Sequence, residues 1–191
     1  MSPKTKTQYK LIRQEKRALI TDTALRVFAE EGYHASSVNR IAERAGISKG
    51  LIYNYFTSKE DLLKKIVFDI YNKIIEKYPL NTKETSGKHV EFFIDKTFEF
   101  VIEDIDRAKL LFSISSQTEV MEILNEKVIE KSLPFMNSIT KYFQTLKHEN
   151  PEAMMYYFFS VLDGVQLNLI YNSKFPSESV KEILKNQFIK S

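Results

Sequence analysis

The 191-residue sequence contains no cysteine, which excludes disulfides, iron–sulfur clusters and thiolate zinc sites. Glycine and proline occur only 5 times each, and there is no low-complexity tract. The most apolar stretch, residues 154–165, is shorter than the roughly 18 residues that indicate a membrane-spanning helix. Residues 1–17 are polar and basic, unlike a signal peptide. We therefore expect a soluble, cytoplasmic protein that does not enter a membrane.

Signatures of catalysis are also missing from the sequence. No HExxH, GxSxG, P-loop or GxGxxG pattern occurs. The three histidines, His34, His89 and His148, are far apart and make a poor metal-binding set without cysteine, although carboxylates could join them in the fold. We predict that the chain is not an enzyme and has no catalytic residues, no metal and no cofactor.

The charge is small overall but unevenly placed. The net charge is +3, and residues 1–60 hold 11 Lys/Arg against 6 Asp/Glu, which leaves the remainder slightly acidic. A basic end on a near-neutral body is typical of a protein that holds DNA at one end, although a solvated surface gives the same imbalance. The basic N-terminal arm, residues 1–16, has little apolar periodicity; it either reaches DNA or is a solvated tail.

The most informative stretch, residues 36–56, reads SSVNRIAERAGISKGLIYNYF. Ser37 can cap a helix whose apolar residues recur at helical spacing up to Ala45, and Gly46 follows where a helix often ends in a left-handed residue. Ser48 can cap a second helix that carries Ile52, Tyr53 and Phe56 toward the interior. Two short helices joined by a turn with glycine predict a helix-turn-helix over about residues 37–56.

The flanking segments are also helical in pattern. Apolar residues predict a helix over 14–31, closed by Gly32, that packs under the helix-turn-helix. Ser58 begins a longer helix that should run to about residue 78 and stop at Pro79, before an exposed loop over 79–89. We expect the boundary between two units within the end of this helix.

Everything after residue 90 has the spacing of helices. Pro134 should kink or divide the stretch 118–146, because proline removes a helical hydrogen bond. The segment 151–171 is apolar almost all round, so it should be buried on more than one side. A last helix follows Ser177. The sequence therefore predicts an all-α protein.

Residues 14–74, with the stretch FAEEGYHASSVNRIAERAGISKGLIYNYFTSKEDLL, resemble the DNA-binding domain of the TetR-type bacterial transcriptional regulators. Residues 75–191 resemble that family only in length and helix order. The resemblance implies a homodimer through the last two helices (about 151–189), a palindromic operator in double-stranded DNA, and an effector cavity in the larger domain. It implies a regulator that associates with the nucleoid when it binds DNA.

The resemblance also implies roles for single residues. Ser37 would contact a phosphate, and Ser48, Lys49, Gly50 and Leu51 would begin the recognition helix, with Lys49 donating to guanine and Gly50 permitting close approach. Leu51 departs from the polar residue common in the family and favours an apolar contact. Tyr53, Asn54 and Tyr55 would contact phosphates and a thymine methyl, and Lys59 another phosphate.

The effector is the least defined part of the prediction. Abundant aromatic residues in the C-terminal domain suggest a ligand that is apolar or amphipathic, although such residues also simply fill helical cores. The candidate lining residues are Phe92, Phe93, Phe98, Phe112, Tyr142, Tyr156 and Phe159. Besides a ligand-released repressor, two alternatives stay open: a constitutive DNA-binding protein without an effector, and an interaction protein whose helix-turn-helix no longer binds DNA.

Overall fold

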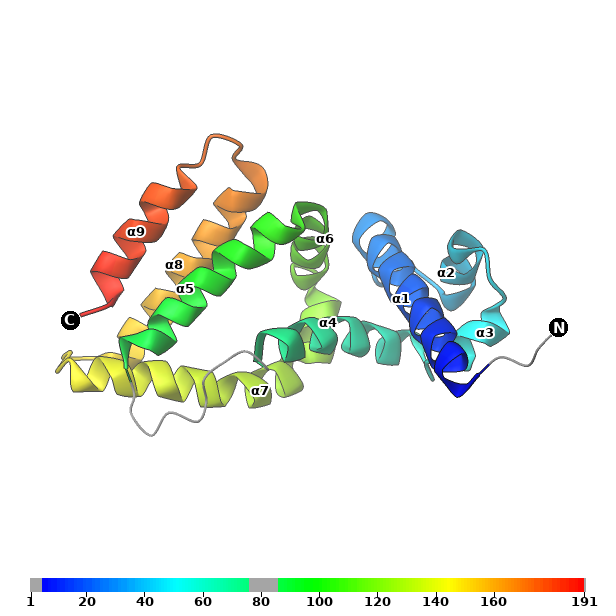
Figure 1. Cartoon of the computed structure of the whole chain (residues 1–191), viewed down its shortest axis with the longest axis horizontal. Helices are drawn as coiled ribbons and strands as arrows, with labels where there is room; N and C mark the ends of the chain where they lie inside the picture. The colour runs from blue at the N-terminus through cyan, green and yellow to red at the C-terminus, as the bar shows by residue number, and fades with distance from the viewer. Residues whose placement is uncertain (1–4, 76–85, 191) are drawn as a thin grey trace. The chain divides into compact units, whose positions relative to one another are not determined.

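The computed structural model describes residues 5–75 and 86–190, and within them it contains helices and no strand (Figure 1). This confirms the predicted all-α class. None of the described helices is long and apolar enough to cross a membrane. The helices are α1 (Lys6–Glu31), α2 (Val38–Ala45), α3 (Lys49–Tyr53), α4 (Lys59–Ile75), α5 (Gly87–Glu103), α6 (Ile105–Ser115), α7 (Thr118–Thr145), α8 (Pro151–Tyr171) and α9 (Ser177–Phe188).

The chain forms two compact units. The first comprises residues 1–72 together with 110–124, and the second comprises residues 73–109 and 125–191. The first unit thus includes the end of α6 and the beginning of α7, although both helices lie in the C-terminal half of the sequence. Nothing in the local pattern of residues 110–124 sets them apart from the neighbouring sequence.

Helix α1 begins at Lys6, two turns earlier than the start predicted near residue 14. Thr5 and Gln8 form a reciprocal capping box, in which the Thr5 hydroxyl accepts from the Gln8 N–H and the Gln8 side chain accepts from the Thr5 N–H. The basic segment 6–16 is therefore helical rather than an irregular arm. Apolar periodicity missed it because these turns carry no buried side chain, and the first buried residue of α1 is Ile20.

The described part of α4 agrees with the predicted long helix. The Ser58 hydroxyl caps it by accepting from the Asp61 N–H at 3.0 Å. Leu62, Leu63 and Ile66 are buried in its first half. The predicted continuation to residue 78, Pro79 and most of the predicted loop 79–89 lie outside the described residues, as do the first four residues of the arm. The loop ends sooner than predicted, because α5 already begins at Gly87.

The second unit is held by aromatic packing among α5, α7, α8 and α9. The Phe158 ring is fully buried and lies 5.1 Å from the Phe188 ring, 5.3 Å from Phe159 and 6.4 Å from Phe143, between ring centroids. The pairs with Phe188 and Phe143 are edge-to-face, an arrangement that adds to the free energy gained from burying the rings. The aromatic cluster joins helices that are distant in sequence.

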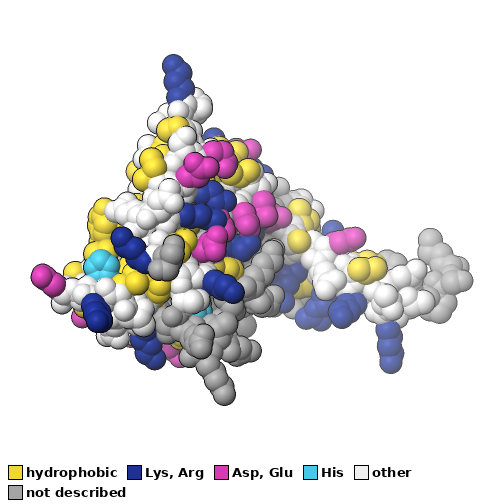
Figure 2. Space-filling model, turned by 60° about the vertical axis from the view of Figure 1, so that its left-hand side comes forward, with side chains coloured by type: hydrophobic (Ala, Val, Ile, Leu, Met, Phe, Trp, Pro, Cys, Tyr) yellow, Lys and Arg dark blue, Asp and Glu magenta, His cyan; other side chains and the backbone are white. Residues whose placement is uncertain are grey.

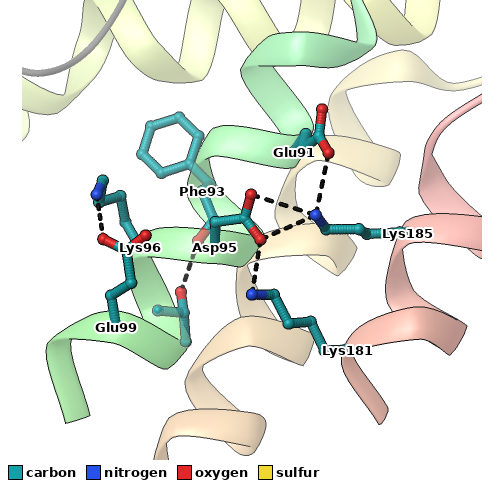
Figure 3. Close-up of polar contacts among 8 residues, drawn as sticks. Glu91, Phe93, Asp95, Lys96, Glu99, Lys181 and Lys185 are labelled. Carbon is teal, nitrogen blue, oxygen red and sulfur yellow. Dashed lines mark hydrogen bonds and ion pairs between the residues drawn. The ribbon is translucent and has the colours of Figure 1, made fainter. Parts of the chain in front are cut away.

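A group of charges ties α5 to α9 beside this core (Figure 3). The carboxylate of Asp95 lies 2.9 Å from the ammonium groups of both Lys181 and Lys185, and Lys185 also contacts Glu91 at 3.0 Å. Burial raises the pKa of Asp95, but hydrogen bonds and attraction from the two lysines outweigh burial and lower it overall. Acidic and basic side chains interleave on this face of the molecule (Figure 2).

Two expectations for the C-terminal helices need correction. Pro134 does not divide its stretch, because α7 runs continuously from Thr118 to Thr145 with the proline inside. Helix α8 is not buried all round within one chain. Its inner face carries Met155, Phe158 and Leu162, but its outer face leaves large apolar side chains exposed.

Candidate nucleic-acid interface

Helix α2 has the two end signals predicted for it. The Ser37 hydroxyl accepts a hydrogen bond from the Arg40 N–H at 3.1 Å, and Gly46 closes the helix with a φ of 63°. The Gly46 N–H donates to backbone carbonyls of the last turn, as the left-handed termination requires. Ile41 and Ala42 face the core. The first helix of the helix-turn-helix is thus confirmed.

Helix α3 is short and mostly solvated. Ser48 caps it by accepting from the Leu51 N–H at 3.2 Å, and Ile52 is its one buried residue, which fixes which face points inward. Ser48, Lys49 and Gly50 are exposed at its N-terminal end, and a Cβ added to Gly50 would meet no atom within 4 Å. The end of α3 is therefore open to a large partner.

Tyr53 does not turn inward as predicted: it is 48% exposed, because it is one helical step beyond Ile52. The Lys49 ammonium lies 5.9 Å from its ring centroid, so the two side chains share the exposed face. Asn54 is exposed at the end of α3, while Leu51 and Tyr55 are half-buried. Tyr55 and Phe56, just beyond α3, underlie Arg13 and Arg17 of α1.

Lys59 lies inside the loop between α1 and α2 rather than extending into solvent. Its ammonium donates to the carbonyl oxygens of Tyr33 at 2.6 Å, His34 at 3.3 Å and Ser36 at 3.0 Å. It also lies 4.2 Å from the centroid of the Tyr33 ring. Burial lowers the pKa of Lys59 and, with nearby carboxylates, raises the pKa of the Tyr33 phenol to about 12. All three ammonium donors are therefore already engaged.

A second polar side chain holds the end of α1 from residues 110–124. Gln117 accepts from the Tyr33 N–H at 2.7 Å and donates to the Phe28 carbonyl at 3.1 Å. The Ser113 hydroxyl donates to the Ala29 carbonyl at 3.2 Å. These side chains satisfy backbone groups that a helix end leaves without helical partners. No local pattern in the sequence indicates these contacts, because the bonded residues are more than 80 positions apart.

Ion pairs join α1 to α2 on the surface of the unit. Arg40 Nε lies 2.9 Å from Glu31 Oε1, and Arg44 lies 2.5 Å from Glu30 Oε2. The Glu31 carboxylate raises the pKa of the Arg40 guanidinium. The Arg40 side chain is therefore paired within the protein.

The predicted ligand-pocket residues do not form one group. Phe93 lies between Phe92, Phe135 and Phe159, with centroid distances of 5.7, 5.9 and 5.3 Å. Phe98 is buried in the same core, whereas Phe112 belongs to the first unit.

Two further candidates lie away from Phe93. The Tyr142 hydroxyl accepts from the Lys190 N–H at 2.9 Å and so fixes the C-terminal end. Tyr156 is 55% exposed on the outer face of α8. Sequence alone did not single out Phe135, which the fold places against Phe93.

Two capped helices around a left-handed glycine turn, with an open second helix, define a helix-turn-helix protein. Residues 20–66 match the family model of bacterial regulatory proteins, tetR family. This match confirms the resemblance of the segment to the DNA-binding domain of the TetR-type regulators.

Relatives of known sequence agree with this assignment. The uncharacterised HTH-type transcriptional regulator YuxN of Bacillus subtilis (strain 168) is 36% identical over 64% of this chain and 43% of its own length. The fatty acid metabolism regulator protein of the same organism is 35% identical over 56% of this chain and 57% of its own length. The chain thus spans about half the length of these curated relatives.

Solved structures extend the likeness of fold to nearly the whole chain. The transcriptional regulator FadR from Bacillus subtilis, in complex with stearoyl-CoA, superposes with a TM-score of 0.71 at 23% identity, covering 91% of this chain and 97% of that one. The fatty acid degradation regulator FadR from Bacillus halodurans gives a TM-score of 0.67 at 22% identity, covering 92% and 95%. At these identities the likeness supports the fold alone.

Proposed function

We propose that the protein is a sequence-specific, DNA-binding transcriptional regulator: a dimeric repressor released from a palindromic operator by a ligand with an apolar chain. One observation carries the DNA-binding part. The N-terminal end of α3 exposes Ser48, Lys49 and Gly50 while Ile52 anchors the helix from behind. In a helix-turn-helix this end of the second helix enters the major groove.

Each exposed group at this end has a role that its chemistry supports. The Lys49 ammonium can donate to O6 and N7 of guanine, and the absent side chain of Gly50 lets the backbone approach the bases. Tyr53 and Asn54 face outward, where they can reach phosphates, and Leu51 can meet a thymine methyl. The hydroxyl of Ser37 and the N–H groups at the start of α2 suit another phosphate.

Lys59 takes a different role in this proposal from the one the resemblance implied. A phosphate contact would cost it one of three hydrogen bonds to carbonyls in the loop between α1 and α2. We assign it to positioning α2, with Gln117 holding the preceding end of α1. Tyr55, half-buried under Arg13, supports the end of α3 and can still present its hydroxyl to a phosphate.

The outer faces of α8 and α9 suit the dimer interface. Tyr156, Tyr157, Leu167 and Tyr171 of α8 and Ile183 of α9 are each at least 40% exposed. An exposed apolar face of this kind marks an interaction surface. Pairing it with its two-fold copy would bury α8 on both sides, as its all-round apolar sequence requires. A dimer of this kind would place two copies of α3 in successive major grooves, about 34–36 Å apart.

The ligand class follows from the aromatic cluster around Phe93 and from two relatives. The apolar surroundings of Phe93, with Phe135 and Phe159, suit an acyl chain. One relative is a fatty acid metabolism regulator, and a protein of the same fold was solved with stearoyl-CoA. We propose a long-chain acyl compound, whose binding shifts α4 and moves the recognition helices out of register. It must bind the arrangement that does not bind DNA more tightly.

The test of DNA binding is selection of bound sites from a random double-stranded pool with the wild-type protein, Lys49→Ala and Gly50→Ala. Lys141→Ala, an exposed lysine of the second unit, is the matched control. We expect an enriched palindrome that Lys49→Ala and Gly50→Ala bind at least tenfold more weakly and Lys141→Ala binds normally. A salt-dependent shift with no preferred site would indicate a constitutive, non-specific protein instead. A folded dimer that binds no DNA would indicate an interaction protein.

The ligand is tested separately by isothermal titration of stearoyl-CoA into free and operator-bound protein. We expect weaker binding to the complex. Equal affinities would contradict release by this compound, whatever the selection shows.

A further inference from the structure

The first three turns of α1 carry a line of cations that the helix-turn-helix does not use. Lys6, Lys10, Arg13 and Arg17 are all exposed, and their spacing of four, three and four residues places them on one face of the helix. We call these four residues the basic stripe. At 1.5 Å per residue it extends for about 16 Å along α1. Glu15 is the one acidic residue among positions 5–21, and its position in the helix is on the opposite side.

The basic stripe continues the face of α1 that packs on the helix-turn-helix. Three residues after Arg17 comes Ile20, followed at intervals of four residues by Ala24 and Phe28, and all three are fully buried. One face of α1 is therefore apolar where it meets the core and basic where it passes beyond it. The basic part carries no fully buried side chain, so core packing contributes little to a helix in this position.

Two contacts fix the direction of the basic stripe relative to α3. The Arg17 guanidinium lies 5.6 Å from the centroid of the Phe56 ring, and the Arg13 guanidinium lies 5.5 Å from that of Tyr55. Both rings directly follow the recognition helix. Figure 1 shows the N-terminal end of α1 beside α3. Lys10 and Lys6 then lie one and two turns farther out, on the side of the unit that carries α3.

We propose that the basic stripe binds the phosphates of DNA that flanks the site contacted by α3, so that each subunit covers a longer stretch of duplex than its helix-turn-helix alone. This inference rests on the proposed DNA-binding function. Duplex DNA carries one negative charge per about 1.7 Å of its axis, so a row of cations about 16 Å long has phosphates to meet along its whole length. Such contacts read no sequence and appear as salt dependence.

The test compares wild-type protein with Lys6→Gln/Lys10→Gln on the selected site, as a core duplex and with about one helical turn of flanking DNA on each side. Lys141→Gln/Lys174→Gln removes the same charge from exposed positions of the second unit. Losing two phosphate contacts per subunit should reduce the slope of log K against log salt by about 1.8 for each subunit bound. For each subunit bound, the affinity lost between 50 and 200 mM salt should therefore be about tenfold smaller in the stripe variant than in the wild-type protein.

The expected result is this reduction on the flanked duplex, little change on the core duplex, and recovery in Lys6→Arg/Lys10→Arg. An unchanged slope in the stripe variant, while wild type and control bind normally, would overturn the inference and leave the proposed function standing. Normal DNA binding by the stripe variant, together with weaker binding of that variant to phosphatidylglycerol vesicles, would also overturn the inference. That result would assign the basic stripe to a lipid surface. Failure of the wild-type protein to bind any duplex would remove the proposed function itself.

Discussion

The two units of this protein are stabilised by different kinds of interaction. The first relies on side chains that satisfy backbone groups: hydroxyl caps at Ser37 and Ser48, a left-handed glycine at Gly46, and the loop contacts of Lys59. The second relies on rings packed between helices, with Phe158 at the centre. Caps and turns fix the direction in which a short helix points, whereas aromatic packing fixes how long helices lie together. The comparison predicts which substitutions should damage each unit.

The largest effect should come from removing a ring at the centre of the second unit. Phe158→Ala deletes a fully buried side chain that touches three other rings, and we expect a loss of about 3–5 kcal/mol in unfolding free energy. Urea unfolding at fixed protein concentration measures it. Ile102→Ala, at a position 64% exposed, should change stability by less than about 0.5 kcal/mol. A loss below about 1 kcal/mol in Phe158→Ala would contradict the conclusion that packed rings stabilise the second unit.

The next effect tests the polar loop of the first unit. Lys59→Met keeps the aliphatic stem but removes three hydrogen bonds to carbonyls, which should cost about 2 kcal/mol and speed amide exchange over residues 33–36. Lys64→Met, on the same helix, loses only an exposed ion pair with Glu60 and should cost about 0.5 kcal/mol. Equal losses in the two variants would show that Lys59 does not organise the loop.

A smaller effect should come from the ion pairs that tie α5 to α9. The pKa of Asp95 is lowered in the folded chain, so its contribution is fully present above the ordinary value of 3.8 and disappears as the pH falls through the folded-state pKa. Asp95→Asn should cost about 1–2 kcal/mol at neutral pH. It should also flatten the fall in stability below pH 3.8. Denaturant titrations across this range test both points, with the exposed Asp106→Asn as control.

The smallest effects should come from two glycine substitutions that change the stability of the protein in opposite directions. Gly46→Ala forces a side chain into a left-handed backbone and should cost about 1 kcal/mol, although no atom obstructs the new Cβ. Gly50→Ala replaces a helical glycine with equally open surroundings and should stabilise the protein by up to about 1 kcal/mol. Urea midpoints of the two variants should move in opposite directions. If both midpoints moved in the same direction, backbone conformation would not explain the two changes in stability.

The helix-turn-helix was predictable because its determinants are local. A serine cap, an apolar face and a left-handed glycine act over three or four residues, so they leave their pattern in adjacent positions, and the structure has them at Ser37, Gly46 and Ser48. Tyr53 was placed inward wrongly because the anchoring residue, Ile52, is only one helical step away.

The rest depends on contacts that leave no local pattern. The early start of α1 was missed because its first turns bury nothing, and its capping box at Thr5 and Gln8 lies before any apolar period. Gln117 gave no signal because its partners are 84 and 89 positions away. Aromatic residues of the second unit were recognised as core or lining, but which ring meets which depends on the packing of whole helices.

The membership of residues 110–124 in the first unit has a consequence for protein engineering. A fragment cut after α4 would lack Gln117 and Ser113, so the end of α1 would lose the side chains that satisfy its backbone. A chimaeric biosensor that grafts a foreign sensing domain after residue 75 would carry the same defect. Transplanting the first unit therefore requires two discontinuous pieces of chain, joined so that residues 110–124 still contact the end of α1.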